Sequence, residues 1–86
     1  MRRLIIKPSF DRDWNRLSIR VQDKLRDQVF VLCEMTLPSR ERDIVKLTGI
    51  TPTTFRLRIG DYRAIFQYDA QTVTLINIGH RKDIYR

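Results

Sequence analysis

The spacing of apolar residues predicts helices in the first half of the chain. Phe10, Trp14 and Leu17 recur every three or four residues, which is the period of a helix with one buried face. A second set of apolar residues continues this period after residue 18: Val21, Leu25, Val29 and Leu32. The pattern predicts a helical hairpin, or one long helix that is broken near residues 15–18.

A short apolar run precedes these helices. Residues 3–7 end at Pro8, and a proline that closes an extended run is typical of a first or edge strand. Ser9 follows directly and is predicted to cap the first helix, because a serine hydroxyl accepts hydrogen bonds from the first helical turn.

In the second half of the chain the apolar period changes from 3.6 to 2, which indicates strands. Apolar residues alternate with arginines over residues 54–59, and Gly60 with Asp61 predicts a two-residue hairpin turn. Strands are predicted over 62–68 and 73–78. The predicted fold is therefore one α+β domain over the whole chain. It has an N-terminal strand, two helices and a three-stranded antiparallel meander with the helices on one face.

The two-residue turn fixes the register of the hairpin. It places Arg58 opposite Arg63 and Arg56 opposite Ile65. Arg56, Arg58 and Arg63 then share one strand surface, which we call the arginine face. The other surface is predicted to pack on the helices: Phe55, Leu57, Ile59, Tyr62, Ala64, Phe66 and Tyr68. Like charges directly opposed across a ladder repel each other, and guanidinium groups bind phosphate oxygens bidentately. The arginine face therefore predicts a phosphate-bearing ligand.

The same register, extended to the third strand, brings a histidine to this surface. It places Tyr68 opposite Val73 and Arg63 opposite Ile78, and alternation then puts His80 on the arginine face, provided that no bulge intervenes. An imidazole gains and loses its proton nearest neutral pH. Arginines that stabilise charge on a phosphorane, beside an imidazole that gives or takes a proton, suit cleavage of a phosphodiester without a metal.

Composition narrows the partner class. The formal net charge is +7, which favours a polyanionic or acidic partner. One cysteine and one histidine argue against an internal disulfide and against a Cys/His metal cluster. No apolar run reaches the length of a membrane span or of a secretion signal. We therefore expect a cytoplasmic protein without metal or cofactor.

At this point the sequence resembles a known family. Residues 55–66, which include the Tyr62-Arg63 pair, and the tail from Gly79 to Arg86 are similar to toxins of the RelE/ParE superfamily. The match is closest to the RelE-type branch, whose tail reads Gly-His-Arg-x-Asp-Ile/Val-Tyr. Length and element order agree as well, so the resemblance spans essentially the whole chain.

The resemblance implies a type II toxin that cleaves mRNA in the ribosomal A site and is silenced by a cognate antitoxin protein. Such enzymes use the ribose 2′-hydroxyl as nucleophile and leave a 2′,3′-cyclic phosphate. Together with the strand pattern, the resemblance predicts these catalytic residues: Arg58, Arg63, His80, Arg81 and Tyr85. It predicts these RNA-binding residues: Lys46, Arg56 and Lys82. Arg56 and Arg58 stand where the family's prototype has lysines.

Three questions stay open at the level of sequence. Arginine is a poor general base, so His80 acts as base or acid, or the ribosome assists. Tyr85 either stacks an unpaired base or covers an apolar floor of the arginine face, predicted as Ile65, Ile76 and Ile78, over which an acidic or amphipathic antitoxin segment would lie. The alternatives to a nuclease are a ParE-like inhibitor of DNA gyrase and an inactive relative that only binds its antitoxin or RNA.

Overall fold

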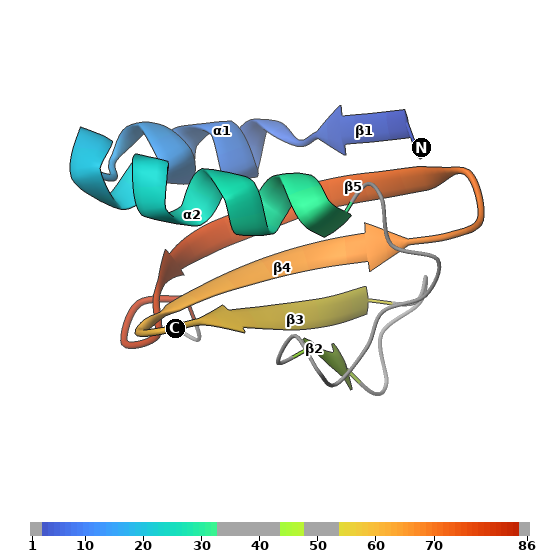
Figure 1. The fold of residues 1–86 in the computed structure, drawn as a ribbon. Coiled ribbons are helices and arrows are strands. Elements are labelled where there is room, and N and C mark those ends of the chain that lie inside the picture. Colours follow the sequence, from blue (N-terminus) through green and yellow to red (C-terminus); the bar gives the residue numbers. More distant parts are fainter. Residues whose placement is uncertain (1–2, 33–43, 48–53, 85–86) are drawn as a thin grey trace.

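The computed structural model describes residues 3–32, 44–47 and 54–84 (Figure 1). The elements, in chain order, are β1 (Arg3–Ile6), α1 (Pro8–Asn15), α2 (Ile19–Leu32), β2 (Ile44–Leu47), β3 (Thr54–Ile59), β4 (Tyr62–Tyr68) and β5 (Thr72–His80). The strands form one sheet in the order β1-β5-β4-β3-β2, in which only the β1–β5 pair is parallel. Both helices lie on one side of this sheet (Figure 1).

The predicted α+β fold is confirmed, with one additional strand. Residues 44–47 were expected to lead into a loop, but they pair with β3 as the edge strand β2. The N-terminal strand lies at the opposite edge, as its closing proline predicted. Neither described helix has the length and apolarity of a membrane-spanning helix.

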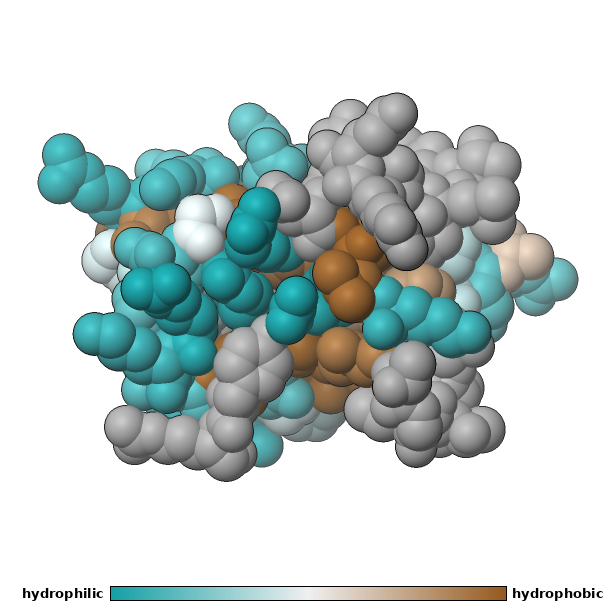
Figure 2. Space-filling model, turned by 90° about the horizontal axis from the view of Figure 1, so that it is seen from below, coloured by the Kyte–Doolittle hydropathy of each residue, from teal (hydrophilic) through white to brown (hydrophobic). Residues whose placement is uncertain are grey.

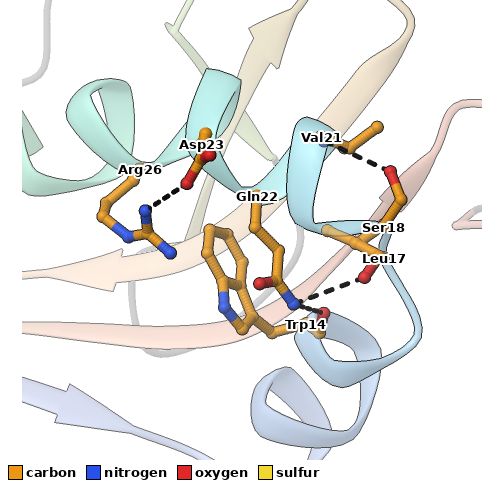
Figure 3. A network of polar contacts seen from close by, with 7 residues as sticks. All are labelled: Trp14, Leu17, Ser18, Val21, Gln22, Asp23 and Arg26. Atoms are coloured by element: carbon orange, nitrogen blue, oxygen red, sulfur yellow. Dashed lines mark hydrogen bonds and ion pairs between the residues drawn. The ribbon is translucent and has the colours of Figure 1, made fainter.

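The predicted break between the helices is confirmed, and local hydrogen bonds define it (Figure 3). The Ser18 hydroxyl accepts a hydrogen bond from the backbone N–H of Val21 at 3.3 Å, which is the contact of an N-cap. The Gln22 amide donates to the carbonyl of Trp14 at 2.8 Å and to that of Leu17 at 3.3 Å. Trp14 lies in the last turn of α1 and Leu17 lies between the two helices, so Gln22 of α2 bonds the segment that joins them.

The β3–β4 hairpin has the predicted register throughout. Gly60 has a φ of 58°, a backbone conformation that residues with a side chain rarely adopt, so glycine suits this turn. The hairpin surface expected to pack on the helices does so. The buried core consists of Phe10, Leu25, Ile44, Leu57, Ala64, Phe66, Val73, Leu75 and Ile78.

The pairing of β4 with β5 contains a bulge that the sequence did not predict. Phe66 pairs with Leu75, but Ile65 pairs with Asn77, so Ile76 is an extra residue. Beyond the bulge, Arg63 lies opposite Gly79, and the prediction that it faces Ile78 is wrong. Because of the extra residue, the β5 side chains beyond the bulge lie on the opposite side of the sheet from the one that uninterrupted alternation predicts.

Side chains of helix α1 form hydrogen bonds with β5 at the bulge. Strand β1 stops pairing with β5 at Leu75, and α1 then covers the β5 edge in its place. The Ser9 hydroxyl donates to the carbonyl of Ile76. The Asp13 carboxylate accepts from the backbone N–H of Ile78 and from the side-chain amide of Asn77, both at 3.0 Å. Ser9 therefore bonds to the strand, and the prediction that it caps α1 is wrong.

Asp13→Ala is expected to lower the free energy of unfolding by roughly 1–3 kcal/mol. The substitution leaves the partly buried N–H of Ile78 and the amide of Asn77 without their acceptor. Urea unfolding monitored by circular dichroism measures the loss. Asp27→Ala removes an exposed carboxylate from α2 and serves as the control, with an expected change within about 0.5 kcal/mol. Equal stability of the two variants would contradict this role of Asp13.

Candidate functional site

The arginine face exists as predicted on β3 and β4. Arg58 is exposed and pairs with Arg63, and Arg56 pairs with Ile65. The Arg63 guanidinium donates through Nη1 to the carbonyls of Gly60 at 2.8 Å and of Tyr62 at 2.9 Å. One nitrogen of Arg63 is thus held at the turn before a ligand arrives, which lowers the entropy cost of binding.

Arg81 lies at the turn end of the arginine face. Its backbone N–H donates to the carbonyl of Asp61 at 2.7 Å, and its Nε lies 3.8 Å from the Asp61 carboxylate. Gly79 stands opposite Arg63 on the neighbouring strand. A Cβ at Gly79 would meet no atom of the described residues within 4 Å. The surface beside Arg63 is therefore open.

The hydrophilic character of this end is visible from the β2 side. Figure 2 shows hydrophilic side chains gathered over the left end of the molecule, where Figure 1 places the β3–β4 turn. Lys24 of α2 approaches the same turn, since its Nζ lies 3.7 Å from the position of a Cβ at Gly60. Cationic groups from β3, β4, the tail and α2 thus meet at one end of the sheet.

His80 does not lie on the arginine face, and the prediction that it does is wrong. Because of the bulge it pairs with Tyr62, whose side chain belongs to the helix-facing surface. The two rings pack edge to face with centroids 5.6 Å apart. The His80 Nδ1 accepts a hydrogen bond from the backbone N–H of Lys82 at 3.2 Å. A neutral His80 ring in this contact carries its proton on Nε2.

The remaining predicted site residues are dispersed. Lys46 is exposed but pairs with Phe55, so alternation places it on the helix-facing side of the sheet, away from Arg56. Lys82 is exposed in the turn after β5. Tyr85 lies outside the described residues. Of the predicted set, the structure brings together the three arginines of the face with Arg81, and it separates Lys46 and His80 from them.

The predicted apolar floor is also only partly present on this surface. Ile65 lies on the arginine face, opposite Asn77. Ile78 is buried against the core with 2% of its surface exposed, so its assignment to the floor is wrong. The same bulge is the reason, because it moves Ile78 opposite Ala64.

A cleft of about 660 Å³, which we call the tail cleft, lies on the side of the sheet where His80 is found. Its lining residues are Asp13, Arg16, Leu17, Tyr62, Asn77, Ile78, Gly79, His80, Asp83 and Ile84. Sequence reasoning placed Tyr62 in the core and did not single out Arg16. The cleft forms where the end of α1 contacts the end of β5. These two segments lie more than 60 residues apart in the sequence. Within the described residues, no group of three or more His, Cys, Asp or Glu side chains could hold a metal ion.

Comparison with solved structures shows the same fold in several toxins. The archaeal RelE-RelB complex from Pyrococcus horikoshii contains a chain 20% identical to this one, with a TM-score of 0.74 over 95% of this chain and 97% of that chain. The E. coli DinJ-YafQ complex contains a chain that is 16% identical, with a TM-score of 0.83 over 99% of this chain and 98% of that chain. The RelBE2 complex from Mycobacterium tuberculosis contains a chain that is 24% identical, with a TM-score of 0.73 over 93% of this chain and 91% of that chain. At these identities the likeness establishes the fold.

The family itself follows from the sequence. No curated protein sequence matches the chain. A family model described as "ParE toxin of type II toxin-antitoxin system, parDE" matches residues 4–85. Since that match spans nearly the whole chain and the fold is that of the RelE and YafQ toxins, the protein belongs to the ParE toxin family of type II toxin–antitoxin systems, within the RelE/ParE superfamily.

Proposed function

We propose that this toxin is an endoribonuclease that cleaves mRNA in the ribosomal A site without a metal, and that the arginine face binds the scissile phosphate. The observation that carries the proposal is the direct pairing of Arg58 with Arg63. Opposed like charges weaken a β-ladder, and a small domain has little stability to spare. A phosphate between the two guanidinium groups removes the repulsion and accepts hydrogen bonds from both.

In the proposed reaction the ribose 2′-oxygen forms a bond to the adjacent phosphorus, and the bond from phosphorus to the 5′-oxygen breaks. The products are a 2′,3′-cyclic phosphate and a 5′-hydroxyl. Arg58 and Arg63, with Arg81 at the turn end, stabilise the negative charge that develops on the phosphorane oxygens. Guanidinium groups keep their protons, so other groups must accept the proton of the 2′-hydroxyl and give a proton to the departing 5′-oxygen. With His80 on the other side of the sheet, water or a ribosomal group is the better-placed acceptor.

The test is primer extension on mRNA incubated with the purified toxin and translating ribosomes. Discrete new 5′ ends that depend on the toxin support the proposal. A second function, inhibition of DNA gyrase, is favoured by the family description, which names ParE. A supercoiling assay with purified gyrase therefore runs in parallel. Inhibited supercoiling without RNA cleavage would establish that alternative, and inactivity in both assays would indicate a relative that only binds.

We further propose that the partner is a cognate antitoxin that covers β1, because several structures of similar fold are complexes with antitoxins. In β1, Leu4, Ile5 and Ile6 are 42%, 38% and 51% exposed. A groove of about 190 Å³ beside β1 is mostly apolar, and its lining includes Leu4, Ile6, Phe10 and Trp14. Exposed apolar side chains on an edge strand favour an added strand or an amphipathic segment.

Ile6→Lys is expected to weaken antitoxin binding about 10- to 100-fold. The change removes apolar burial worth roughly 1.5–3 kcal/mol. Isothermal titration calorimetry with the antitoxin measures the dissociation constant. Ile19→Lys is the matched control, since Ile19 is 75% exposed and does not line the groove. Equal affinities for the two variants would exclude the β1 surface.

A further inference from the structure

The tail cleft exposes an edge of β5 that no strand among the described residues covers. The pairing of β5 with β1 ends at Leu75, while β5 continues to His80. Helix α1 bonds the carbonyl of Ile76 and the N–H of Ile78, and the tail turn bonds the carbonyl of His80. Because N–H and C=O of one strand residue point to the same side, the carbonyl of Ile78 and the N–H of His80 lie on this edge too.

These two groups form a paired acceptor and donor. No contact among the described residues occupies either one. They belong to residues two apart on one strand edge, and both residues line the tail cleft. The Watson–Crick edge of a nucleobase presents neighbouring donor and acceptor groups of the same kind, and proteins that bind unpaired RNA read that edge.

The walls of the cleft suit a base and its phosphate. Tyr62 and His80 present aromatic rings, on which bases stack. Arg16, directly after α1, is exposed and lines the same cleft, and its guanidinium can bind phosphate or stack on a base. Asp13 also lines the cleft, but its carboxylate already accepts two hydrogen bonds from β5. The volume, about 660 Å³, falls within the range of roughly 300–1,000 Å³ typical of small-ligand sites.

The cleft and the arginine face share the end of β5. Gly79 lines the tail cleft and also lies opposite Arg63 on the neighbouring strand. One RNA strand that passes around this end of the sheet can therefore contact both surfaces.

We infer that the tail cleft binds one nucleobase of the RNA strand whose phosphate lies on the arginine face, with Arg16 holding that nucleotide. The inference rests on the proposed function and adds a site that selects the nucleotide beside the cut. The backbone of Ile78 and His80 contacts the base edge, and Tyr62 contacts its face.

The first test is titration of the ¹⁵N-labelled full chain with AMP, GMP, CMP and UMP in separate samples, followed by NMR. We expect shifts of the Ile78, Gly79 and His80 amide signals with at least one nucleotide. Arg16→Gln is expected to weaken that binding about tenfold or more, because a hydrogen bond to a charged group contributes roughly 1.5–3 kcal/mol. Arg12→Gln is the matched control. It removes an exposed arginine from α1 that does not line the cleft, and its affinity should equal that of the parent.

The second test separates this inference from the nuclease proposal. Arg16→Gln should lower mRNA cleavage at the sites that the parent prefers and change the preference for the nucleotide beside the cut, whereas Arg12→Gln should leave both unchanged. Unchanged cut positions together with no nucleotide-dependent shifts would overturn the inference, while cleavage that depends on Arg63 would still stand. Shifts of the same amides with an acidic antitoxin peptide, but with none of the four nucleotides, would also overturn it. Nucleotide-dependent shifts without any mRNA cleavage would retain the base site and overturn the nuclease proposal.

Discussion

Arg63→Ala should abolish growth arrest and lower mRNA cleavage on ribosomes by about 10²- to 10³-fold. This is the loss that follows when one donor to a developing oxyanion is removed. Arg63 combines three features of such a donor: it lies opposite Arg58, its guanidinium is bonded to the turn carbonyls, and Gly79 leaves the surface beside it open. The measurement is the rate of appearance of new 5′ ends by primer extension, beside growth curves after induction.

Two further variants are compared with Arg63→Ala. Arg12→Ala removes an exposed arginine far from the face and should leave cleavage unchanged. Arg58→Ala should also reduce cleavage, because it removes the guanidinium that lies opposite Arg63. Full toxicity of Arg63→Ala, with normal folding, would refute the assignment of the arginine face.

Phe66→Ala should have the largest effect on stability, a loss of roughly 3–5 kcal/mol. Phe66 is fully buried at the centre of β4, and its ring stacks on Phe55 at 5.6 Å. A protein of 86 residues has a total free energy of unfolding of roughly 4–13 kcal/mol. The cavity therefore removes a large part of the total, and urea unfolding measures it.

A graded series makes this result interpretable. Phe66→Leu leaves a smaller cavity and should lose less than Phe66→Ala. Val45→Ala truncates a side chain that is 46% exposed on the edge strand β2, and it should change stability by about 0.5 kcal/mol or less. If Phe66→Ala were no more destabilising than Val45→Ala, the helix-facing core would be wrongly described.

Local rules were sufficient for the β3–β4 hairpin. A glycine with positive φ in a two-residue turn, together with strict alternation on both sides, leaves only one register with a buried apolar face. That is why the Arg58–Arg63 pairing could be predicted from sequence. The helix break was likewise local, because Ser18 and Gln22 satisfy groups within eight residues of themselves.

The bulge could not be predicted by such rules. Ser9 and Asp13, which bond to the bulge, lie more than 60 residues away in sequence from Ile76 and Ile78. No local pattern of residues predicts a contact between segments so far apart. Strand β2 was not predicted from the sequence for a related reason. Four residues carry little periodicity, and the pairing with β3 decides their conformation. The errors on His80, Ile78 and Lys46 all follow from strand pairings that tertiary contacts define.

The additional residue at Ile76 has an evolutionary consequence. A chain of the same length whose β5 paired with β4 without the bulge would place Arg63 opposite Ile78, and His80 and Arg81 would exchange sides of the sheet. A lineage could in this way exchange the guanidinium of Arg81 for the imidazole of His80 on the arginine face while every amino acid of its C-terminal motif stays the same. In this superfamily, identical tails therefore need not imply identical chemistry, and the register of the last strand must be established before roles are transferred.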